Sequence, residues 1–313
     1  MNADKTAATD LPTLFDPETC VRKGLCPVSS IRNKGDPFEK HSLYFEQHGN
    51  GPEKIIFIMG SFAWAGQVEY FGRIPRYSVL VFDNRGVGNS SAPRGPYTTS
   101  GMAEDTITLL NYVGWTEHRD LHVVAVSLGG MIGQELAYRI PERIISLTLA
   151  VTTAGGKPWN NFPPNEDKIP MIHDMVFPRE WLDAKAEDDP QGRTNREVQS
   201  EIYRKRMDVT RPQTFMGTIS QMAAGLTHYM SPDRLRRISK SVPKVLILTG
   251  DEDHLVRPSN SIHLKQHMPE AELVEWERTG HGIHVQWKKR FNDLLERVFE
   301  EGRQRVEDFA PEL

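Results

Sequence analysis

Short hydrophobic runs alternate with longer segments of helical periodicity from about residue 41 onward. The short runs are rich in β-branched residues, and they predict strands near 41–48, 54–59, 77–83, 121–126, 144–151, 244–250 and 271–277. The longer segments predict helices near 99–113, 129–139, 257–267 and 284–300. Such alternation favours an α/β fold, with a mostly parallel sheet and helices on both of its faces.

Two regions depart from this rhythm. Residues 1–40 are rich in Pro, Gly and charge without a sustained period, which predicts an irregular N-terminal arm that carries no chemistry. Residues 153–240 begin with a stretch rich in Pro, Asn and Gly and continue through helical segments, which predicts a helical cap inserted between two strands. The core is therefore expected to comprise 41–152 and 241–313.

Composition narrows the class of protein. Hydrophobic residues make up 38% and charged residues 26% of the chain, as in globular proteins. The 38 Lys and Arg against 42 Asp and Glu leave no basic excess for nucleic acid or an anionic membrane. The longest apolar runs are shorter than the ~20 residues of a membrane span. The N-terminus shows no signal pattern, so we expect a cytoplasmic protein.

The two cysteines, Cys20 and Cys26, both lie in the predicted arm. Their spacing is not that of a zinc motif, so we expect two reduced thiols.

A single serine lies where a predicted strand turns into a helix. The segment 121–137 reads LHVVAVSLGGMIGQELA and contains the pattern A-x-S-x-G around Ser127. A nucleophile on such a sharp turn needs small residues two positions away on each side, and Ala125 and Gly129 meet this requirement. A serine that only caps the following helix is the structural alternative.

A nucleophile of this kind needs backbone donors for the oxyanion that it creates. The N–H of Leu128, at the start of the helix, is one candidate. The turn after the strand at 54–59 should supply the other, with the Ser61 N–H preferred and the Phe62 N–H as the fallback. A tight turn at Gly60 without catalytic meaning is the alternative.

A base and a carboxylate follow at two later strand ends. His281 lies in TGHG after the last predicted strand, and Asp253 lies in GDED after the strand before it. The order Ser, Asp, His matches that of α/β hydrolases. Asp251 is not excluded as the carboxylate, whereas Glu252 is expected to be a turn or capping residue.

Neighbouring histidines offer a competing interpretation. His254 and His284 could compete with His281 as the base. A metal site of His281 and His284 lacks a third ligand in a helical frame, so we expect no metal.

The run from Val81 to Ser90, VFDNRGVGNS, contains glycines but neither of the common phosphate-binding patterns. We therefore expect a loop in which Asp83 and Arg85 hydrogen-bond to neighbouring segments.

These segments together resemble a known superfamily. FDNRGVGNS, AVSLGGMIGQELA, RIPERIISLTL, GDEDHLV and TGHG are similar to motifs of the α/β-hydrolase superfamily over about residues 41–300. The run 82–153 is similar to aclacinomycin methylesterase-like and enol-lactonase-like hydrolases and their fungal relatives. The chain departs from the family pattern at Met59, where His is common, at Ala125, where Gly is common, and in a short loop after Gly60.

The resemblance implies a Ser-His-Asp triad at Ser127, His281 and Asp253 and a helical cap that forms the substrate pocket. It implies hydrolysis of a small-molecule carboxylic ester without a cofactor. Lactone opening, C–C bond hydrolysis, acyl transfer and ligand binding on the same scaffold remain alternatives. Apolar residues in and near the cap are candidate substrate contacts: Trp64, Trp159, Phe162, Met216 and Met222. The helical spacing of Phe215, Ile219, Met222 and Leu226 predicts a face packed on a core or cleft.

Overall fold

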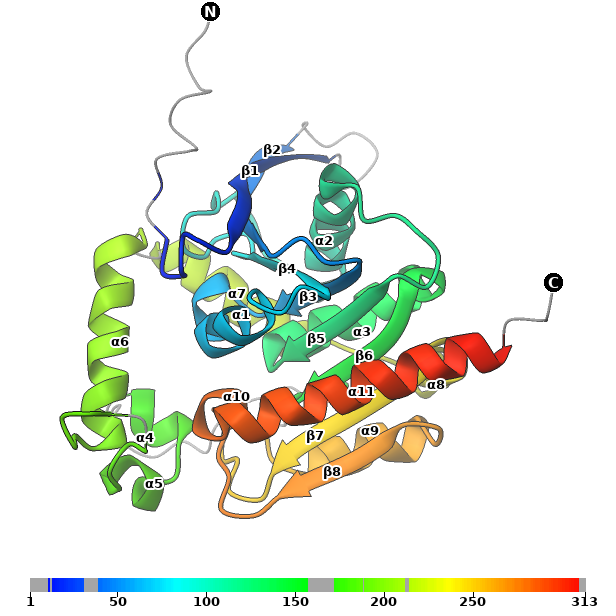
Figure 1. Cartoon of the computed structure of the whole chain (residues 1–313). Coiled ribbons are helices and arrows are strands. Elements are labelled where there is room, and N and C mark those ends of the chain that lie inside the picture. The colour runs from blue at the N-terminus through cyan, green and yellow to red at the C-terminus, as the bar shows by residue number, and fades with distance from the viewer. Residues whose placement is uncertain are drawn as a thin grey trace, which may run out of the picture.

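The computed structural model describes residues 11, 13–30, 39–156, 172–187, 189–211 and 214–309. Within them an eight-stranded sheet has the order β1-β2-β4-β3-β5-β6-β7-β8 (Figure 1). Its strands are β1 (Cys20–Ser30), β2 (Glu39–His48), β3 (Glu53–Ile58), β4 (Tyr77–Phe82), β5 (Leu121–Val126), β6 (Ile144–Ala150), β7 (Lys244–Gly250) and β8 (Glu272–Trp276). The predicted α/β fold is confirmed.

Most strands of the sheet are parallel. β1 pairs antiparallel with β2, and β2 pairs antiparallel with β4. All neighbours from β4 through β8 pair in parallel. The carboxyl ends of these six strands therefore lie along one edge of the sheet, which is where open α/β folds bind ligands.

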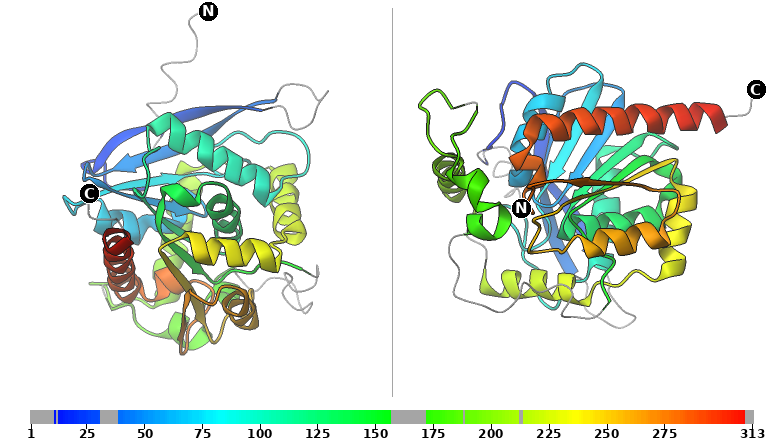
Figure 2. Two further views of the ribbon diagram at one scale, coloured as in Figure 1. Left: turned by 90° about the vertical axis from the view of Figure 1, so that its right-hand side faces the viewer. Right: turned by 90° about the horizontal axis from the view of Figure 1, so that it is seen from below.

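Helices cover both faces of the sheet (Figure 2). One face carries α2 (Thr99–Val113), α3 (Leu128–Arg139), α8 (Pro232–Ser241) and α9 (Ser259–His267). The other face carries α1 (Ala65–Phe71), α10 (Ile283–Gln286) and α11 (Lys288–Phe309). Two short 3-10 helices, η1 (Ser61–Trp64) and η2 (Pro141–Arg143), lie in the connections between strands and helices. No helix in the described ranges combines the length and apolar composition needed to cross a membrane.

The central strands are buried on both sides. All six residues of β5 are buried, and consecutive ones face opposite ways. Val123 packs in the core with Leu136 of α3, whereas Val124 packs in the other core with Phe299 of α11. Double burial explains why the strands read as continuous hydrophobic runs rather than as alternating ones.

The prediction of an irregular arm over residues 1–40 was wrong for β1, which extends the sheet at its edge. Alternate residues Gly24, Cys26 and Val28 are buried, so the strand has a period of two. The small size of Gly24 and the presence of Pro27 weakened the hydrophobic signal. An edge strand tolerates proline because one side of its backbone has no partner strand.

Between β6 and β7 the described residues contain α4 (Ile172–Val176), α5 (Arg179–Asp183), α6 (Asn195–Val209), α7 (Phe215–Thr227) and α8. Figure 1 shows α4, α5 and α6 beyond the edge where the arrowheads of β7 and β8 end. Helix α8 packs on α3 and α9, at the core. The boundary of the cap at residues 153–240 stays a prediction.

The predicted inward face of α7 was wrong. Phe215, Ile219 and Met222 are 77%, 43% and 51% exposed, and Leu226 is half-buried. The buried residues are instead small: Gly217, Ser220 and Ala224. Periodicity locates a stripe on a helix but does not say which stripe packs, and small residues allow the backbone to approach its neighbour closely.

Candidate active site

Ser127 lies on a strained turn between β5 and α3. Its backbone has φ 56° and ψ −123°, a conformation that residues other than glycine rarely adopt. Its N–H donates to the Ala150 carbonyl at 3.0 Å, and its carbonyl accepts from Thr152 Oγ1 at 2.7 Å. The Ser127 side chain makes no capping hydrogen bond to α3, which argues against the alternative of a simple cap. The strain is typical of a functional site.

Small residues let three segments meet at this turn. A Cβ added to Gly129 would lie 1.8 Å from the Ile58 carbonyl oxygen, so only glycine allows α3 to start beside the end of β3. A Cβ on Gly133 would lie 2.9 Å from Cβ of Ala125. The first turn of α3 is therefore held against the loop that follows β3, which is where oxyanion donors were expected.

Asp253 and His281 form a buried pair. His281 Nδ1 lies 2.8 Å from Asp253 Oδ2. The other carboxylate oxygen accepts from the backbone N–H groups of Leu255 and Val256 at 2.9 and 2.8 Å. Because the carboxylate accepts hydrogen bonds, the Nδ1 atom carries the imidazole proton and Nε2 remains the basic nitrogen.

Asp251 has another place in the structure. It is exposed, and its Oδ1 accepts from the Thr279 N–H at 3.1 Å. This bond ties together the loops that follow β7 and β8. A Cβ on Gly250 would lie 2.2 Å from the Thr279 carbonyl oxygen, so the two loops also approach closely. Asp251 therefore acts as a turn residue, and Asp253 is the carboxylate that meets His281.

The topology brings the serine and the Asp-His pair to the same edge. Ser127 directly follows β5, Asp253 follows β7 and His281 follows β8. Strands β5, β6, β7 and β8 are adjacent and parallel, so all three residues lie at carboxyl ends of neighbouring strands. This arrangement suits transfer of a proton from a hydroxyl to an imidazole that a carboxylate orients.

The prediction that the Ser61 N–H is an oxyanion donor was wrong. Its N–H donates to Asp83 Oδ1 at 3.1 Å, and its hydroxyl donates to the same oxygen at 2.6 Å. The backbone group that would face an oxyanion is thus directed at a carboxylate. Leu128 is the first residue of α3, whose N-terminal N–H groups lack intrahelical acceptors. Leu128 and the fallback Phe62 stay as predictions.

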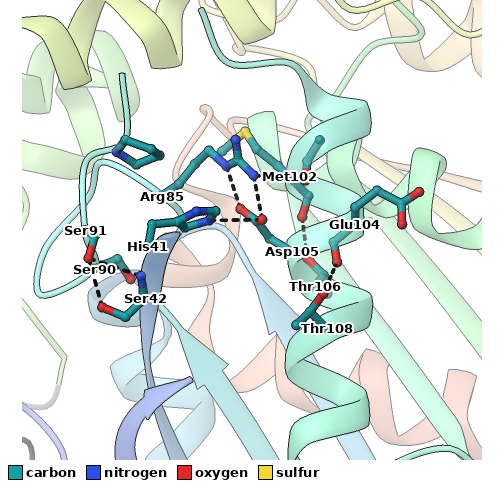
Figure 3. A network of polar contacts seen from close by, with 12 residues as sticks. His41, Ser42, Arg85, Ser90, Ser91, Met102, Glu104, Asp105, Thr106 and Thr108 are labelled. Carbon is teal, nitrogen blue, oxygen red and sulfur yellow. Dashed lines mark hydrogen bonds and ion pairs between the residues drawn. The ribbon is translucent and has the colours of Figure 1, made fainter. Parts of the chain in front are cut away.

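The loop after β4 locks this region, as predicted for Asp83 and Arg85. Asp83 Oδ2 accepts from the Asn89 N–H at 2.9 Å while Oδ1 holds Ser61. Arg85 makes a two-pronged ion pair with Asp105 of α2, at 2.6 and 2.5 Å. Figure 3 shows His41 on the same carboxylate, with Nε2 at 3.2 Å from Oδ1. Sequence reasoning missed Asp105, because only the fold brings it opposite Arg85.

His284 is a structural residue. Its Nε2 donates to the Ala63 carbonyl at 3.0 Å, and its ring packs on Trp64 with a centroid separation of 4.9 Å. Burial lowers the pKa of His284 to about 4, so the ring is neutral. His281 is engaged with Asp253 instead, so the two histidines do not share a ligand site.

The structure describes three of the five candidate substrate contacts. Trp64 is fully buried and packs on Phe57 in the core. Met216 and Met222 are 62% and 51% exposed on α7. Trp159 and Phe162 lie outside the described residues. Trp64 is therefore a core residue, as aromatic residues serve packing as readily as binding, and Met216 and Met222 stay predictions.

Comparisons with known proteins agree with the fold. A family model described as alpha/beta hydrolase fold matches residues 48–286. The chain is 31% identical over 207 residues to a poly(3-hydroxyalkanoate) depolymerase of Ectopseudomonas oleovorans, covering 64% of this chain and 67% of that protein. It is 28% identical over 240 residues to 3-oxoadipate enol-lactonase 2 of Acinetobacter baylyi, covering 75% and 82% of the two chains.

Solved structures share the architecture. A thermophilic esterase from Thermogutta terrifontis superimposes with a TM-score of 0.65 at 20% identity, covering 88% of this chain and 98% of that one. At this level of identity the likeness supports the fold alone.

Proposed function

Because the chain belongs to the alpha/beta hydrolase fold family, we propose that it is a serine hydrolase that cleaves a small-molecule carboxylic ester through an acyl-enzyme. The hydrogen bond of 2.8 Å between Asp253 and His281 carries this proposal. It orients a basic imidazole at the strand edge that also carries Ser127 on its strained turn. Ser127 is the nucleophile, His281 the general base, and Asp253 the carboxylate that orients the base.

Acylation begins when His281 Nε2 takes the proton of Ser127 Oγ as this oxygen attacks the ester carbonyl. The negative charge that develops on the carbonyl oxygen is stabilised by the Leu128 N–H and by a second donor from the loop after β3. His281 then gives its proton to the leaving alcohol. Throughout, the Asp253 carboxylate stabilises the imidazolium that forms.

Deacylation repeats these steps with water. His281 Nε2 removes a proton from water, which attacks the acyl carbon, and the returned proton restores the Ser127 hydroxyl. The products are a carboxylic acid and a free enzyme.

A lactone is the second candidate substrate. It is an intramolecular ester, so the same groups open it without a further residue. The similarity to an enol-lactonase favours this candidate specifically. The relatives described as a poly(3-hydroxyalkanoate) depolymerase and as putative carbamate hydrolases widen the range of acyl groups to be tested.

We also propose that the insertion between β6 and β7 forms a cap beside this site. Ser220 of α7 donates to the Gly95 carbonyl at 3.1 Å, and Gln221 donates to the Arg85 carbonyl at 2.5 Å. A Cβ on Gly225 would lie 3.9 Å from Leu128 Cδ1, next to the nucleophile. Helix α7 therefore packs close to the serine turn.

Covalent labelling with a fluorophosphonate tests the nucleophile. Intact mass should show one adduct on the wild type and none on Ser127→Ala, because a fluorophosphonate reacts with an activated serine hydroxyl. Ser29→Ala, at an exposed position of β1, is the matched control and should label like the wild type. Circular dichroism verifies that each variant is folded.

An adduct that persists on Ser127→Ala would assign the chemistry to another residue. A folded wild type that gives no adduct would overturn the serine mechanism and favour ligand binding without turnover. Once labelling succeeds, a panel of aryl esters and lactones of equal acyl length distinguishes the two substrate classes by kcat/KM.

A further inference from the structure

A cysteine, a glutamate and a histidine meet away from the strand edge that carries Ser127. Cys20 is the first residue of β1 and pairs across the ladder with His48, the last residue of β2. Glu46 lies two residues before His48, so both side chains leave the same face of β2. His48 pairs with Val79 in the first half of β4, whereas the carboxyl end of β4 leads to the active-site edge.

The distances between the three ligand atoms fit one metal ion. One ligand atom from each of Cys20, Glu46 and His48 lies within 4.8 Å of the other two. His48 Nε2 is 3.5 Å and Cys20 Sγ is 4.0 Å from Glu46 Oε2. Tetrahedral zinc with usual bond lengths separates a nitrogen from an oxygen by about 3.4 Å and a sulfur from an oxygen by about 3.6 Å. The two distances to Glu46 Oε2 are thus within a few tenths of an ångström of those in a coordination shell.

The hydrogen bonds around His48 direct a lone pair into this cluster. Thr19 Oγ1 donates its only proton to the Asp16 carbonyl at 3.0 Å, so it accepts from His48 Nδ1 at 2.9 Å. Nδ1 then carries the proton of the neutral ring, and Nε2 presents its lone pair to Glu46. A histidine that ligates a metal commonly donates its other N–H in this way.

His48 Nε2 has no hydrogen-bond partner among the described residues, although the side chain is fully buried. Its separation of 3.5 Å from Glu46 Oε2 is long for a charge-assisted hydrogen bond, which is usually about 2.7–2.9 Å. A buried imidazole nitrogen that lacks a partner is costly. A cation between Nε2, the carboxylate and the thiolate removes this cost.

We propose that Cys20, Glu46 and His48 bind a divalent metal ion of the zinc class. One thiolate, one imidazole and one carboxylate suit a borderline-soft ion, and a water molecule completes four-coordination. A thiolate and a carboxylate together neutralise a charge of +2, which allows the site to be buried. This proposal replaces the expectation that Cys20 is a simple free thiol, which the spacing of the two cysteines suggested.

Neighbouring residues support the ligands. Glu46 Oε1 accepts from Tyr44 at 2.9 Å, and Oε2 accepts from Thr13 Oγ1 at 2.7 Å. The ring of Phe15 packs edge-on against His48, with centroids 5.1 Å apart. A metal ion here would fasten β1 and the segment before it to β2.

Titration of the untagged full chain with Co²⁺ after treatment with a chelator tests the site. We expect one ion per chain, with the near-ultraviolet charge-transfer band of a cobalt thiolate and visible bands of tetrahedral intensity. One equivalent of Zn²⁺ should displace the cobalt and raise the midpoint of thermal unfolding, because the ion binds the folded state.

Cys20→Ser should abolish the charge-transfer band and weaken Co²⁺ binding by at least about tenfold, because a neutral hydroxyl replaces the thiolate. Cys26→Ser is the matched control, since Cys26 is buried in the same strand and lies outside the cluster. It should bind cobalt like the wild type. Labelling of Ser127 should be unaffected by either serine variant.

Glu46→Gln keeps one oxygen acceptor, for either Tyr44 or Thr13, and removes the charge, so it tests the site independently should Cys20→Ser fail to fold. It too should bind Co²⁺ at least about tenfold more weakly. The proposal is overturned if the wild type shows no thiolate band, or if a folded Cys20→Ser variant retains it. Unchanged affinity in Glu46→Gln would equally contradict it, leaving a histidine-glutamate ion pair without metal.

Discussion

Arg85 and Asp105 form an ion pair whose side chains are 6% and 3% exposed. Replacing Arg85 by Gln leaves the Asp105 carboxylate buried, with the His41 imidazole as its remaining side-chain contact among the described residues. Breaking a buried pair on one side typically costs about 3–5 kcal/mol of the free energy of unfolding. We expect a loss of that order, measured by urea unfolding.

The control for this pair is Arg73→Gln. Arg73 is paired with Asp16, but its side chain is 56% exposed, so its loss should cost less than about 1 kcal/mol. If the two substitutions lowered the free energy of unfolding equally, burial of the Arg85–Asp105 pair would not be what makes it stabilising. Labelling of a folded Arg85→Gln variant should also be slower, since the Arg85 loop holds Asp83 against Ser61.

Gly129 offers a second test at the residue scale. An added methyl group would lie 1.8 Å from the Ile58 carbonyl oxygen, so Gly129→Ala has to shift the start of α3 and Ser127 with it. We expect destabilisation of about 1–3 kcal/mol from overpacking. The rate of fluorophosphonate labelling should fall on the order of tenfold or more, because the nucleophile is displaced.

Gly225→Ala is the matched substitution in a second helix. Its new methyl group would lie 3.9 Å from Leu128 Cδ1, an ordinary contact. It should leave labelling unchanged and raise helix propensity slightly. Wild-type labelling in Gly129→Ala would show that the serine turn does not depend on this close approach.

The roles of single residues could be predicted where their order along the chain relative to the strands indicates which residues meet. The pairing of His281 with Asp253 was predicted because the two residues follow consecutive strands, and the structure shows their hydrogen bond. The engagement of Ser61 by Asp83 could not be predicted, because it depends on the orientation of a loop. Side-chain contacts between distant loops are set by three-dimensional packing.

At the scale of elements, Glu272 links β7, β8 and α11. Its carboxylate lies 2.6 Å from Lys244 Nζ and 2.7 Å from Arg297 Nη2. The hydrogen bond from Arg297 and the one from Lys244 lower the pKa of Glu272 to about 2. Because this folded value lies below the unfolded one, the pair contributes stability above about pH 4.5, and this is lost as pH falls toward 2.

Glu272→Gln should therefore destabilise the protein at pH 7 by about 1 kcal/mol, a value that allows for solvent screening. The difference from the wild type should shrink as the pH is lowered from 4.5 toward 2. Glu275→Gln, at an exposed position of β8, is the control and should have little effect at any pH. A pH-independent loss in Glu272→Gln would indicate a packing effect instead.

Strands buried on both faces of the sheet were predictable from the sequence, whereas the edge strand β1 was not. β5 and β7 were predicted nearly to the residue because most positions in them are hydrophobic and all are buried. β1 was missed because it is an edge strand with Gly24 and Pro27. Helix α7 was predicted, but its orientation was not, because its packed stripe consists of small residues.

At the scale of the whole molecule, the parallel order of the strands was the predictable part. Alternating strands and helices leave few arrangements of a sheet, and the order Ser, Asp, His then places the candidate residues along one edge. The antiparallel extension by β1 and β2 carries no comparable sequence signal, since strand partners at an edge are chosen by local pairing. The mainly parallel sheet was therefore predicted, whereas the added edge strand β1 was not.

Buried histidines determine how the molecule responds to mild acid. His228 and His284 lie at separate places in the fold, and burial lowers the pKa of each to about 4. The unfolded chain binds protons at these sites from about pH 6.5 downward, whereas the folded chain does not until about pH 4. Stability is thus complete above pH 6.5 and is lost as pH falls toward 4, by roughly 2 kcal/mol per histidine at pH 5.

The slope of unfolding free energy between pH 7 and pH 5 measures this loss. His284→Gln should flatten the slope, whatever it costs in packing at pH 7, because it removes one of the histidines whose pKa burial lowers, while His228 and the fully buried His122 remain. His118→Gln, at an exposed position, should keep the wild-type slope. The Glu272 ion pair titrates below this window, so a slope that His284→Gln leaves unchanged would show that the ring is not held neutral by burial.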